Sequence, residues 1–174
     1  MDSSINIVID TFEKAISNIC FYGDSQVLTD SGYKKIKNIT TDDTIRGKHI
    51  AQLTKTTSKD KYIVKMSQGC IFENMPNKDT YITKNHKVLY KGKMTEAKNI
   101  LNSNVCECVY DGSTLYNILL EGDEEGKMVV NGMIVETLDP KNNVAKLYNI
   151  ISQNVGNEAE ILKIFNEKKL IHVN

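Results

Sequence analysis

Several residue types that help to assign a sequence to a class of protein are rare in this chain. It has no tryptophan, two prolines, three histidines and four cysteines among 174 residues. It also lacks an excess of charge, since 22 Lys and Arg balance 22 Asp and Glu. Nucleic-acid binding depends on many cations that neutralise phosphates, so a balanced chain gives no reason to expect that partner.

Long apolar segments are missing as well. No run approaches the roughly 18 apolar residues that cross a bilayer. The start, Met1-Asp2-Ser3-Ser4, lacks the basic flank and apolar stretch of a secretory signal. We therefore expect a cytoplasmic protein with no membrane partner. At 40% hydrophobic and 25% charged residues, the chain has the composition of a globular protein, and its length suits one domain with a proper core.

The cysteines do not form the pattern of a disulfide framework in a chain without a secretory signal. Cys106 and Cys108, with His49 and Cys70, contain metal-binding residue types, but the usual C-x₂₋₄-C pair is missing. The alternative is that these cysteines are small buried hydrophobes. We expect no metal and no cofactor.

Short strands separated by polar turns fill the middle of the chain, from residue 20 to 138. Asn131-Gly132 predicts a two-residue hairpin, because both positions tolerate positive φ. We find no internal repeat. The predicted strands are 26–29, 33–36, 50–54, 61–66, 80–83, 87–90, 105–110, 115–120, 128–130 and 133–135.

Helical patterns flank this β region on both sides. Apolar residues recur at helical spacing from Phe12 to Ile19, and Asp10 suits the N-cap. A second helical pattern runs from Val144 to Val155, and a shorter one contains Phe165. The predicted organisation is an N-terminal flank over 1–19, a β domain over 20–138 and a helical extension over 139–174.

Several blocks together resemble the Hint superfamily, which contains inteins and Hedgehog autoprocessing domains. Cys20-Phe21-Tyr22-Gly23-Asp24-Ser25-Gln26-Val27-Leu28 is similar to the opening of that domain. Thr83-Lys84-Asn85-His86 looks like its Thr-x-x-His block, and residues 115–120 with 129–135 resemble its closing strands. The resemblance implies a mainly β, horseshoe-like Hint fold with pseudo-two-fold symmetry, here carrying short helical flanks.

The resemblance also implies a self-cleaving chemistry. Cys20 would attack the carbonyl of Ile19 and convert the peptide bond into a thioester. His86 would protonate the departing amide nitrogen, and Thr83 would hydrogen-bond that amide. Asp79 is a further candidate, for orienting His86 or a loop backbone.

The end of the domain departs from the intein pattern. Glu136-Thr137 stands where the family has His-Asn, and threonine has no side-chain amide to cyclise. We therefore expect no splicing.

Two alternatives stay open. One is single-turnover self-cleavage, with the thioester captured by water or a small nucleophile. The other is an inert Hint scaffold whose helical flanks bind protein partners, by analogy with stand-alone viral Hint domains, in which case the virion is the expected location.

Overall fold

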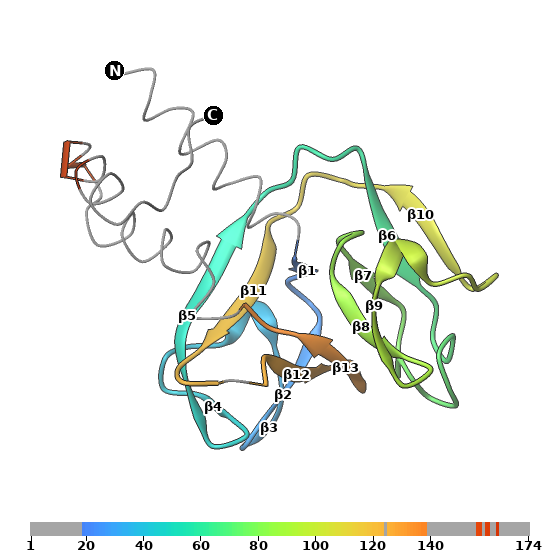
Figure 1. Ribbon diagram of the computed structural model, residues 1–174, viewed down its shortest axis with the longest axis horizontal. Coiled ribbons are helices and arrows are strands. Elements are labelled where there is room, and N and C mark those ends of the chain that lie inside the picture. The colour runs from blue at the N-terminus through green and yellow to red at the C-terminus, as the bar shows by residue number, and fades with distance from the viewer. Residues whose placement is uncertain (1–18, 124, 139–155, 158, 161–162, 164–174) are drawn as a thin grey trace.

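The computed structural model describes residues 19–123, 125–138, 156–157, 159–160 and 163 (Figure 1). Thirteen strands make up this part of the chain, in two antiparallel sheets, which confirms the mainly β prediction. The predicted helical flanks, 1–19 and 139–174, lie almost wholly outside the described residues. Residues 159, 160 and 163 are in helical conformation, but almost all the remaining residues of both flanks lie outside the described part, so the flanks as predicted gain no support here. The named elements of the described part are strands and two short 3₁₀ helices.

The larger sheet has seven strands in the order β10-β6-β7-β1-β11-β5-β4. The two-residue strand β1 lies inside the sheet and pairs with both β7 and β11, whereas the equally short β4 is at the edge and pairs with β5, the longest strand. The strands are β1 (Phe21–Tyr22), β4 (Thr44–Ile45), β5 (Lys48–Thr56), β6 (Tyr62–Met66), β7 (Thr80–Ile82), β10 (Val105–Val109) and β11 (Leu115–Leu120).

The smaller sheet has six strands in the order β3-β2-β12-β13-β8-β9. One face of it carries the fully buried Val27, Val88, Val130 and Val135, which join the main core with Phe21 of β1. The strands are β2 (Gln26–Thr29), β3 (Gly32–Lys35), β8 (Lys87–Tyr90), β9 (Lys93–Glu96), β12 (Lys127–Val130) and β13 (Met133–Glu136).

The chain does contain an internal repeat, and the prediction that it has none was wrong. The hairpin β2–β3 leads into the 3₁₀ helix η1 (Ile36–Asn38), and the hairpin β8–β9 leads into η2 (Ala97–Asn99). The two units have the same cross-strand register at a constant offset of 61 residues. Five of the fourteen aligned positions carry the same residue, in the matching segments Val-Leu at 27–28 and 88–89 and Lys-Asn-Ile at 37–39 and 98–100. The repeat is consistent with the expected pseudo-two-fold relation.

Ten of the strands coincide with predicted segments, with ends that differ by a residue or two. The structure adds β1, β4 and β9, which the sequence did not reveal. The first two have only two residues each, too few for an alternating pattern. The third, Lys93-Met94-Thr95-Glu96, is mostly polar and becomes a strand by pairing with β8.

The predicted hairpin at Asn131-Gly132 is confirmed, with φ of 48° and 79° at its two central residues. The Asn131 side chain is buried and joins separate parts of the fold. Its Oδ1 accepts from the Gln26 nitrogen at 2.8 Å, and its Nδ2 donates to Thr80 Oγ1 at 2.7 Å. One turn residue therefore links β12, β2 of its own sheet and β7 of the other sheet.

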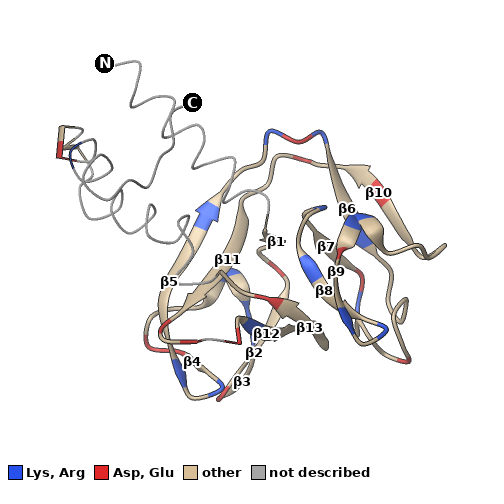
Figure 2. Cartoon of the chain, viewed as in Figure 1, with Lys and Arg blue, Asp and Glu red and all other residues tan. Residues whose placement is uncertain are grey.

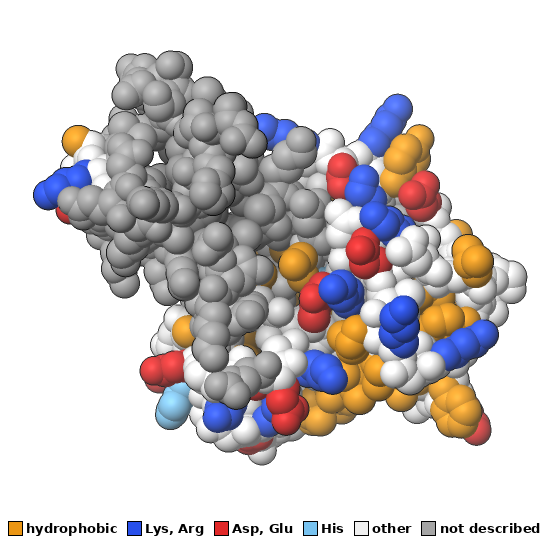
Figure 3. Space-filling view, viewed as in Figure 1, with side chains coloured by type: hydrophobic (Ala, Val, Ile, Leu, Met, Phe, Trp, Pro, Cys, Tyr) orange, Lys and Arg blue, Asp and Glu red, His pale blue; other side chains and the backbone are white. Residues whose placement is uncertain are grey.

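Charged side chains of both signs are spread over both sheets (Figure 2). On the face drawn in Figure 3, blue and red side chains alternate at short range among hydrophobic ones, and no single-sign block is visible. None of the described residues belongs to a helix long and apolar enough to span a membrane.

Replacing Asn131 by Ala should lower the free energy of unfolding by about 2 kcal/mol or more, because Gln26 N–H and the Thr80 hydroxyl lose buried partners. The left-handed backbone adds to that cost, because alanine tolerates it less well than asparagine. Urea unfolding measures the change. Asn38→Ala, at an exposed position in η1, is the matched control and should stay within about 0.5 kcal/mol of the parent. Equal stabilities for the two variants would contradict the linking role of Asn131.

Candidate functional site

The candidate site is built around Cys20, the residue directly before β1. Phe21 lies opposite Ile82 in the antiparallel pair β1–β7, so the next residues along the strands, Cys20 and Thr83, are neighbours. The Cys20 nitrogen donates to Thr83 Oγ1 at 2.8 Å, and the Thr83 nitrogen donates to the Cys20 carbonyl at 3.0 Å. Both residues are buried. The structure therefore places Thr83 on the amide nitrogen of the peptide bond between Ile19 and Cys20.

The oxygen of the same peptide bond is held from the other side. Asn117 Nδ2 donates to the Ile19 carbonyl oxygen at 2.5 Å. Asn117 lies in β11, which pairs with β1 along the edge that does not face β7. The Asn117 side chain is fully buried, and its Oδ1 accepts from the Ile118 nitrogen at 2.8 Å, which fixes the orientation of the amide. Thr83 and Asn117 thus bind the nitrogen and the oxygen of one peptide bond.

Asn117 did not emerge from the sequence as a candidate. The signal that could have identified it is an amide inside the apolar run Leu115-Tyr116-Asn117-Ile118-Leu119-Leu120. A polar side chain at a buried strand position needs a hydrogen-bonding partner. The run itself gives no indication that this partner is the carbonyl of a residue 98 positions earlier.

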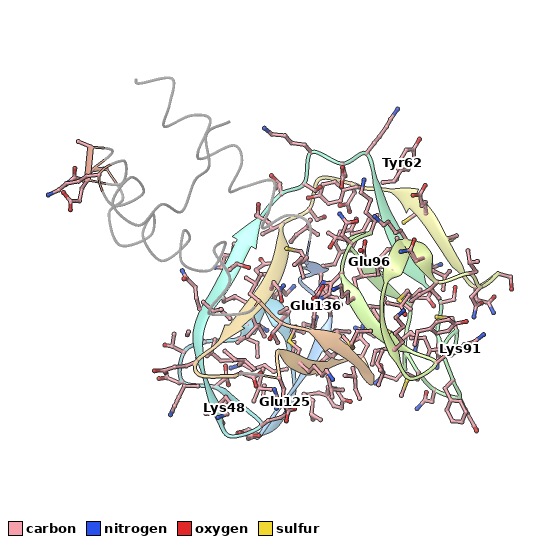
Figure 4. All side chains as sticks on the ribbon, viewed as in Figure 1. Lys48, Tyr62, Lys91, Glu96, Glu125 and Glu136 are labelled. Carbon is pink, nitrogen blue, oxygen red and sulfur yellow. The ribbon has the colours of Figure 1, made fainter. Side chains whose placement is uncertain are left out.

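His86 has no exposed surface, and the Cys20 backbone lies close to its ring. Its ring packs against Phe21, with centroids 4.4 Å apart. Nε2 lies 2.8 Å from the carbonyl oxygen of Glu136. Glu136 belongs to β13 and is labelled near the centre of the molecule in Figure 4. A carbonyl can only accept, so Nε2 carries the hydrogen in the neutral ring and Nδ1 has the free lone pair.

Burial lowers the pKa of His86 to about 4, and the backbones of Glu136 and Cys20 offset only part of that effect. The imidazole is therefore neutral at physiological pH. Nδ1 has no hydrogen-bond partner of good geometry, although the Cys20 backbone lies near enough to favour the protonated ring. A neutral imidazole in this arrangement can accept a proton at Nδ1, and it can donate one from Nδ1 only after it has gained it.

The thiol of Cys20 is enclosed. It lies among Ile63 and Leu115, with Tyr22 and Tyr81 packed against the same cluster. Burial raises the pKa of the Cys20 thiol well above its usual range, and a hydrogen bond with the Ile19 backbone lowers it only in part. The thiol is consequently protonated at neutral pH.

Asp79 lies apart from these residues. Its Oδ1 accepts from the Gln68 nitrogen at 2.9 Å, and its Oδ2 forms an ion pair with Lys65 at 3.2 Å. These contacts hold the pKa of Asp79 below its usual value. Of the two roles considered for Asp79, its contacts match support of a loop backbone, since it binds Gln68 and not His86.

The closing positions hold Glu136 and Thr137. Burial raises the pKa of the Glu136 carboxyl, which accepts from the Lys87 nitrogen at 2.9 Å. Thr137 is buried, and its hydroxyl has no hydrogen-bond partner in the described structure. Neither side chain is an amide, so no asparagine cyclisation can occur there.

The residues considered for a metal site are separated in the fold. His49 is in β5, Cys70 is buried in a loop of the main core, and Cys106 and Cys108 are in β10, all three cysteines with free thiols. Within the part of the chain that the structure describes, no three His, Cys, Asp or Glu side chains are grouped to hold an ion. His172 lies outside the described residues.

Because the pKa of His86 is below its value in the unfolded chain, stability should fall on acidification. Between pH 6.5 and 4 the unfolded state binds the proton and the native state does not, so the free energy of unfolding decreases as pH falls through that window. The largest loss attributable to His86 is about 3 kcal/mol. Urea unfolding at several pH values should show a steeper acid dependence for the parent than for His86→Gln. Identical slopes would contradict a neutral, buried His86.

Comparison with known proteins shows which solved structures share this fold. No protein-family model matches the sequence, and no curated protein matches it. Among solved structures, the bacterial intein-like domain from Clostridium thermocellum is similar with a TM-score of 0.55 and 14% identity, over 68% of this chain and 98% of that one. The PabCDC21-1 intein is similar with a TM-score of 0.53 and 14% identity, over 68% of this chain and 98% of that one. The DnaB intein from Synechocystis sp. is similar with a TM-score of 0.51 and 16% identity, over 69% of this chain and 99% of that one. The resemblance to inteins is therefore confirmed at the level of the fold, and the chain has the fold of inteins and intein-like domains.

Proposed function

We propose that this chain is a Hint-fold autoprocessing domain that forms a thioester at Ile19–Cys20 and cleaves there without splicing. The observation that carries the proposal is the pair of hydrogen bonds on one peptide bond, from Asn117 to the Ile19 oxygen and between Thr83 and the Cys20 nitrogen. Most buried backbone groups pair with other backbone groups. Side chains from two separate strands on a single peptide bond are what an acyl shift at that bond would use.

The proposed reaction begins when Cys20 Sγ attacks the carbonyl carbon of Ile19. The thiol proton passes to the lone pair of His86 Nδ1, and negative charge develops on the Ile19 oxygen. The Asn117 amide stabilises that charge, as a donor in an oxyanion hole does. When the C–N bond breaks, the proton moves from His86 to the Cys20 nitrogen. The products are a thioester between Ile19 and Cys20 Sγ and a free α-amine on Cys20.

Burial of both reacting groups sets the expected rate. The protonated thiol must lose its proton as it attacks, because the thiolate is the nucleophile. The neutral His86 can accept that proton, but its lowered pKa makes it a weak base. Ile19 is β-branched, which crowds its carbonyl. We therefore expect slow cleavage at neutral pH, and faster cleavage as the pH rises.

Release of the N-terminal segment requires a second nucleophile to reach the thioester. A cleft of about 440 Å³ lies beside the tyrosines that cover Cys20 and shares Tyr22 and Tyr81 with that cluster. The two rings stack with centroids 5.2 Å apart. Movement of these rings would connect the cleft with the thioester and admit water or a small nucleophile. Hydrolysis would leave a carboxylate on Ile19 and regenerate the Cys20 thiol.

The second candidate function is an inert Hint fold that acts as a structural or assembly protein, in the cytoplasm or in a virion. The observation that favours it is the enclosure of Cys20, which has no exposed surface and a strongly raised thiol pKa. Glu136-Thr137 at the closing positions also fits a domain that has lost chemistry. Under this alternative the helical flanks would bind protein partners.

Intact mass of freshly purified protein, with dithiothreitol and hydroxylamine, tests the autoprocessing proposal. We expect these nucleophiles to split the chain between Ile19 and Cys20, with a hydroxamate on Ile19 when hydroxylamine is used. Cys20→Ala should abolish the split. The matched control is Cys70→Ala, which also removes a buried free thiol but lies away from the scissile bond, and it should cleave like the parent. A parent chain that keeps its full mass over days with both reagents would favour the inert alternative.

Asn117→Ala should slow the hydroxylamine-induced cleavage by roughly 10²- to 10³-fold, the usual effect of losing an oxyanion-hole donor. Thr54→Val is its control, because Thr54 is buried on the neighbouring strand and its hydroxyl donates to the Asn117 backbone carbonyl at 3.2 Å. That variant should cleave within a few-fold of the parent. Thermal unfolding of both variants separates a rate effect from misfolding. Parent-like cleavage by Asn117→Ala would remove the assigned role.

A further inference from the structure

The six-stranded sheet carries an apolar row on the face that points away from the core. Val27 lies opposite Val130, and Val135 lies opposite Val88, all four being buried. The next residue on each strand points to the other face, because side chains alternate along a strand. Following the pairings across the sheet, these outward residues are Tyr33, Leu28, Val129, Ile134, Leu89 and Met94, one from each strand.

This row departs from the usual pattern of an antiparallel sheet, in which one face is apolar and the solvent face is polar. Leu28 is 39% exposed and Tyr33 is 49% exposed, while the other four are half-buried. Hydrophobic side chains also gather over the region of β8, β12 and β13 on the face drawn in Figure 3. A continuous apolar row across six strands marks an interaction surface more clearly than scattered exposed residues do.

A row of charges runs beside the apolar row. The charged residues lie on four of the six strands, each two positions from the apolar residue of its strand. They are Lys127 of β12, Glu136 of β13, Lys87 of β8 and Glu96 of β9. In the spatial order of the strands their signs alternate, plus, minus, plus, minus. Figure 4 labels the two acidic members, Glu136 and Glu96, on this part of the molecule.

The order of the charges has a specific symmetry. Reversing the row turns plus, minus, plus, minus into minus, plus, minus, plus, so the row is complementary to its own reverse. A two-fold axis parallel to the strands, passing between β13 and β8, produces this reversal. It would place Lys127 of one copy over Glu96 of the other and Glu136 over Lys87, with Ile134 over Leu89 beside them.

We propose that this face of the six-stranded sheet is a self-association surface, through which two copies of the chain pack sheet against sheet around a two-fold axis. Val129, Ile134, Leu89 and Met94 supply the buried area, because this axis leaves Tyr33 and Leu28 beyond the overlap of the two copies, and the alternating charges set the alignment. Aligned packing of two sheets is a common arrangement, and an isologous contact of this kind closes after two copies.

The charges favour a second copy over other occupants. A polyanion or a strongly basic partner would require a row of one sign, and this row has two charges of each sign. An unrelated partner would not require the row to be complementary to its own reverse, whereas a two-fold contact does. The surface is independent of the autoprocessing proposal, and the Cys20→Ala chain should associate like the parent.

Sedimentation velocity of the full chain from micromolar to submillimolar concentration tests the surface. The mass should rise with concentration from 19.6 kDa toward twice that value. Ile134→Lys, in the middle of the apolar row, should remain monomeric over the whole range. Leu101→Lys is the control, since Leu101 is 92% exposed but lies outside the sheet, and it should associate like the parent. A monomeric parent, or a dimeric Ile134→Lys, would overturn the proposal.

A charge exchange tests the alignment and does not depend on the stability of any one variant. Lys127→Glu alone would place Glu opposite Glu96 of the other copy, and Glu96→Lys alone would place Lys opposite Lys127. Each should weaken association at least tenfold. An equimolar mixture of the two variants should restore it as a heterodimer, and so should a chain carrying both changes. If mixing leaves association unchanged, the proposed two-fold alignment is wrong.

Discussion

The position of β1 between β7 and β11 is the constraint on which the candidate site depends. This strand has only two residues, and both of its edges are occupied. The residue before it, Cys20, therefore lies between Thr83 on one neighbouring strand and Asn117 on the other. Backbone pairing alone would satisfy a peptide group in a longer strand. Here the strand ends, and side chains take over the hydrogen bonds to the Ile19–Cys20 peptide.

Burial fixes the positions of the Cys20 and His86 side chains, but it makes both groups less reactive. It encloses Cys20 beside Ile63 and Leu115 and fixes the His86 ring between Phe21 and the Glu136 carbonyl. The same loss of water raises the pKa of the thiol and lowers the pKa of the imidazole, because both charged forms lose solvation. An attack that transfers the proton directly from sulfur to imidazole avoids forming either ion in advance. This is why a well-positioned site can still be slow.

The internal repeat gives His86 a structural counterpart with no chemistry. Ser25 precedes β2 as His86 precedes β8, and each carbonyl accepts from the first residue of the following 3₁₀ helix, at 2.8 Å from Ile36 and 2.9 Å from Ala97. The backbone at this position is therefore a feature of the repeated unit. The proposed chemistry would depend on the side chain that occupies this position in the second unit and on the proximity of Cys20.

The sequence by itself determined the mainly β class, most of the strands and the hairpin at Asn131-Gly132, because alternation and turn residues act over a few positions. It also indicated Cys20, Thr83 and His86, through the blocks that resemble the Hint superfamily. The repeat that relates β2–β3 to β8–β9 also left matching Val-Leu and Lys-Asn-Ile segments in the sequence, which the common strand register made recognisable. Only the tertiary structure showed Asn117 at the Ile19 carbonyl and the apolar row on the outer sheet face. Each of these depends on strand order and register between distant segments, which local patterns do not encode.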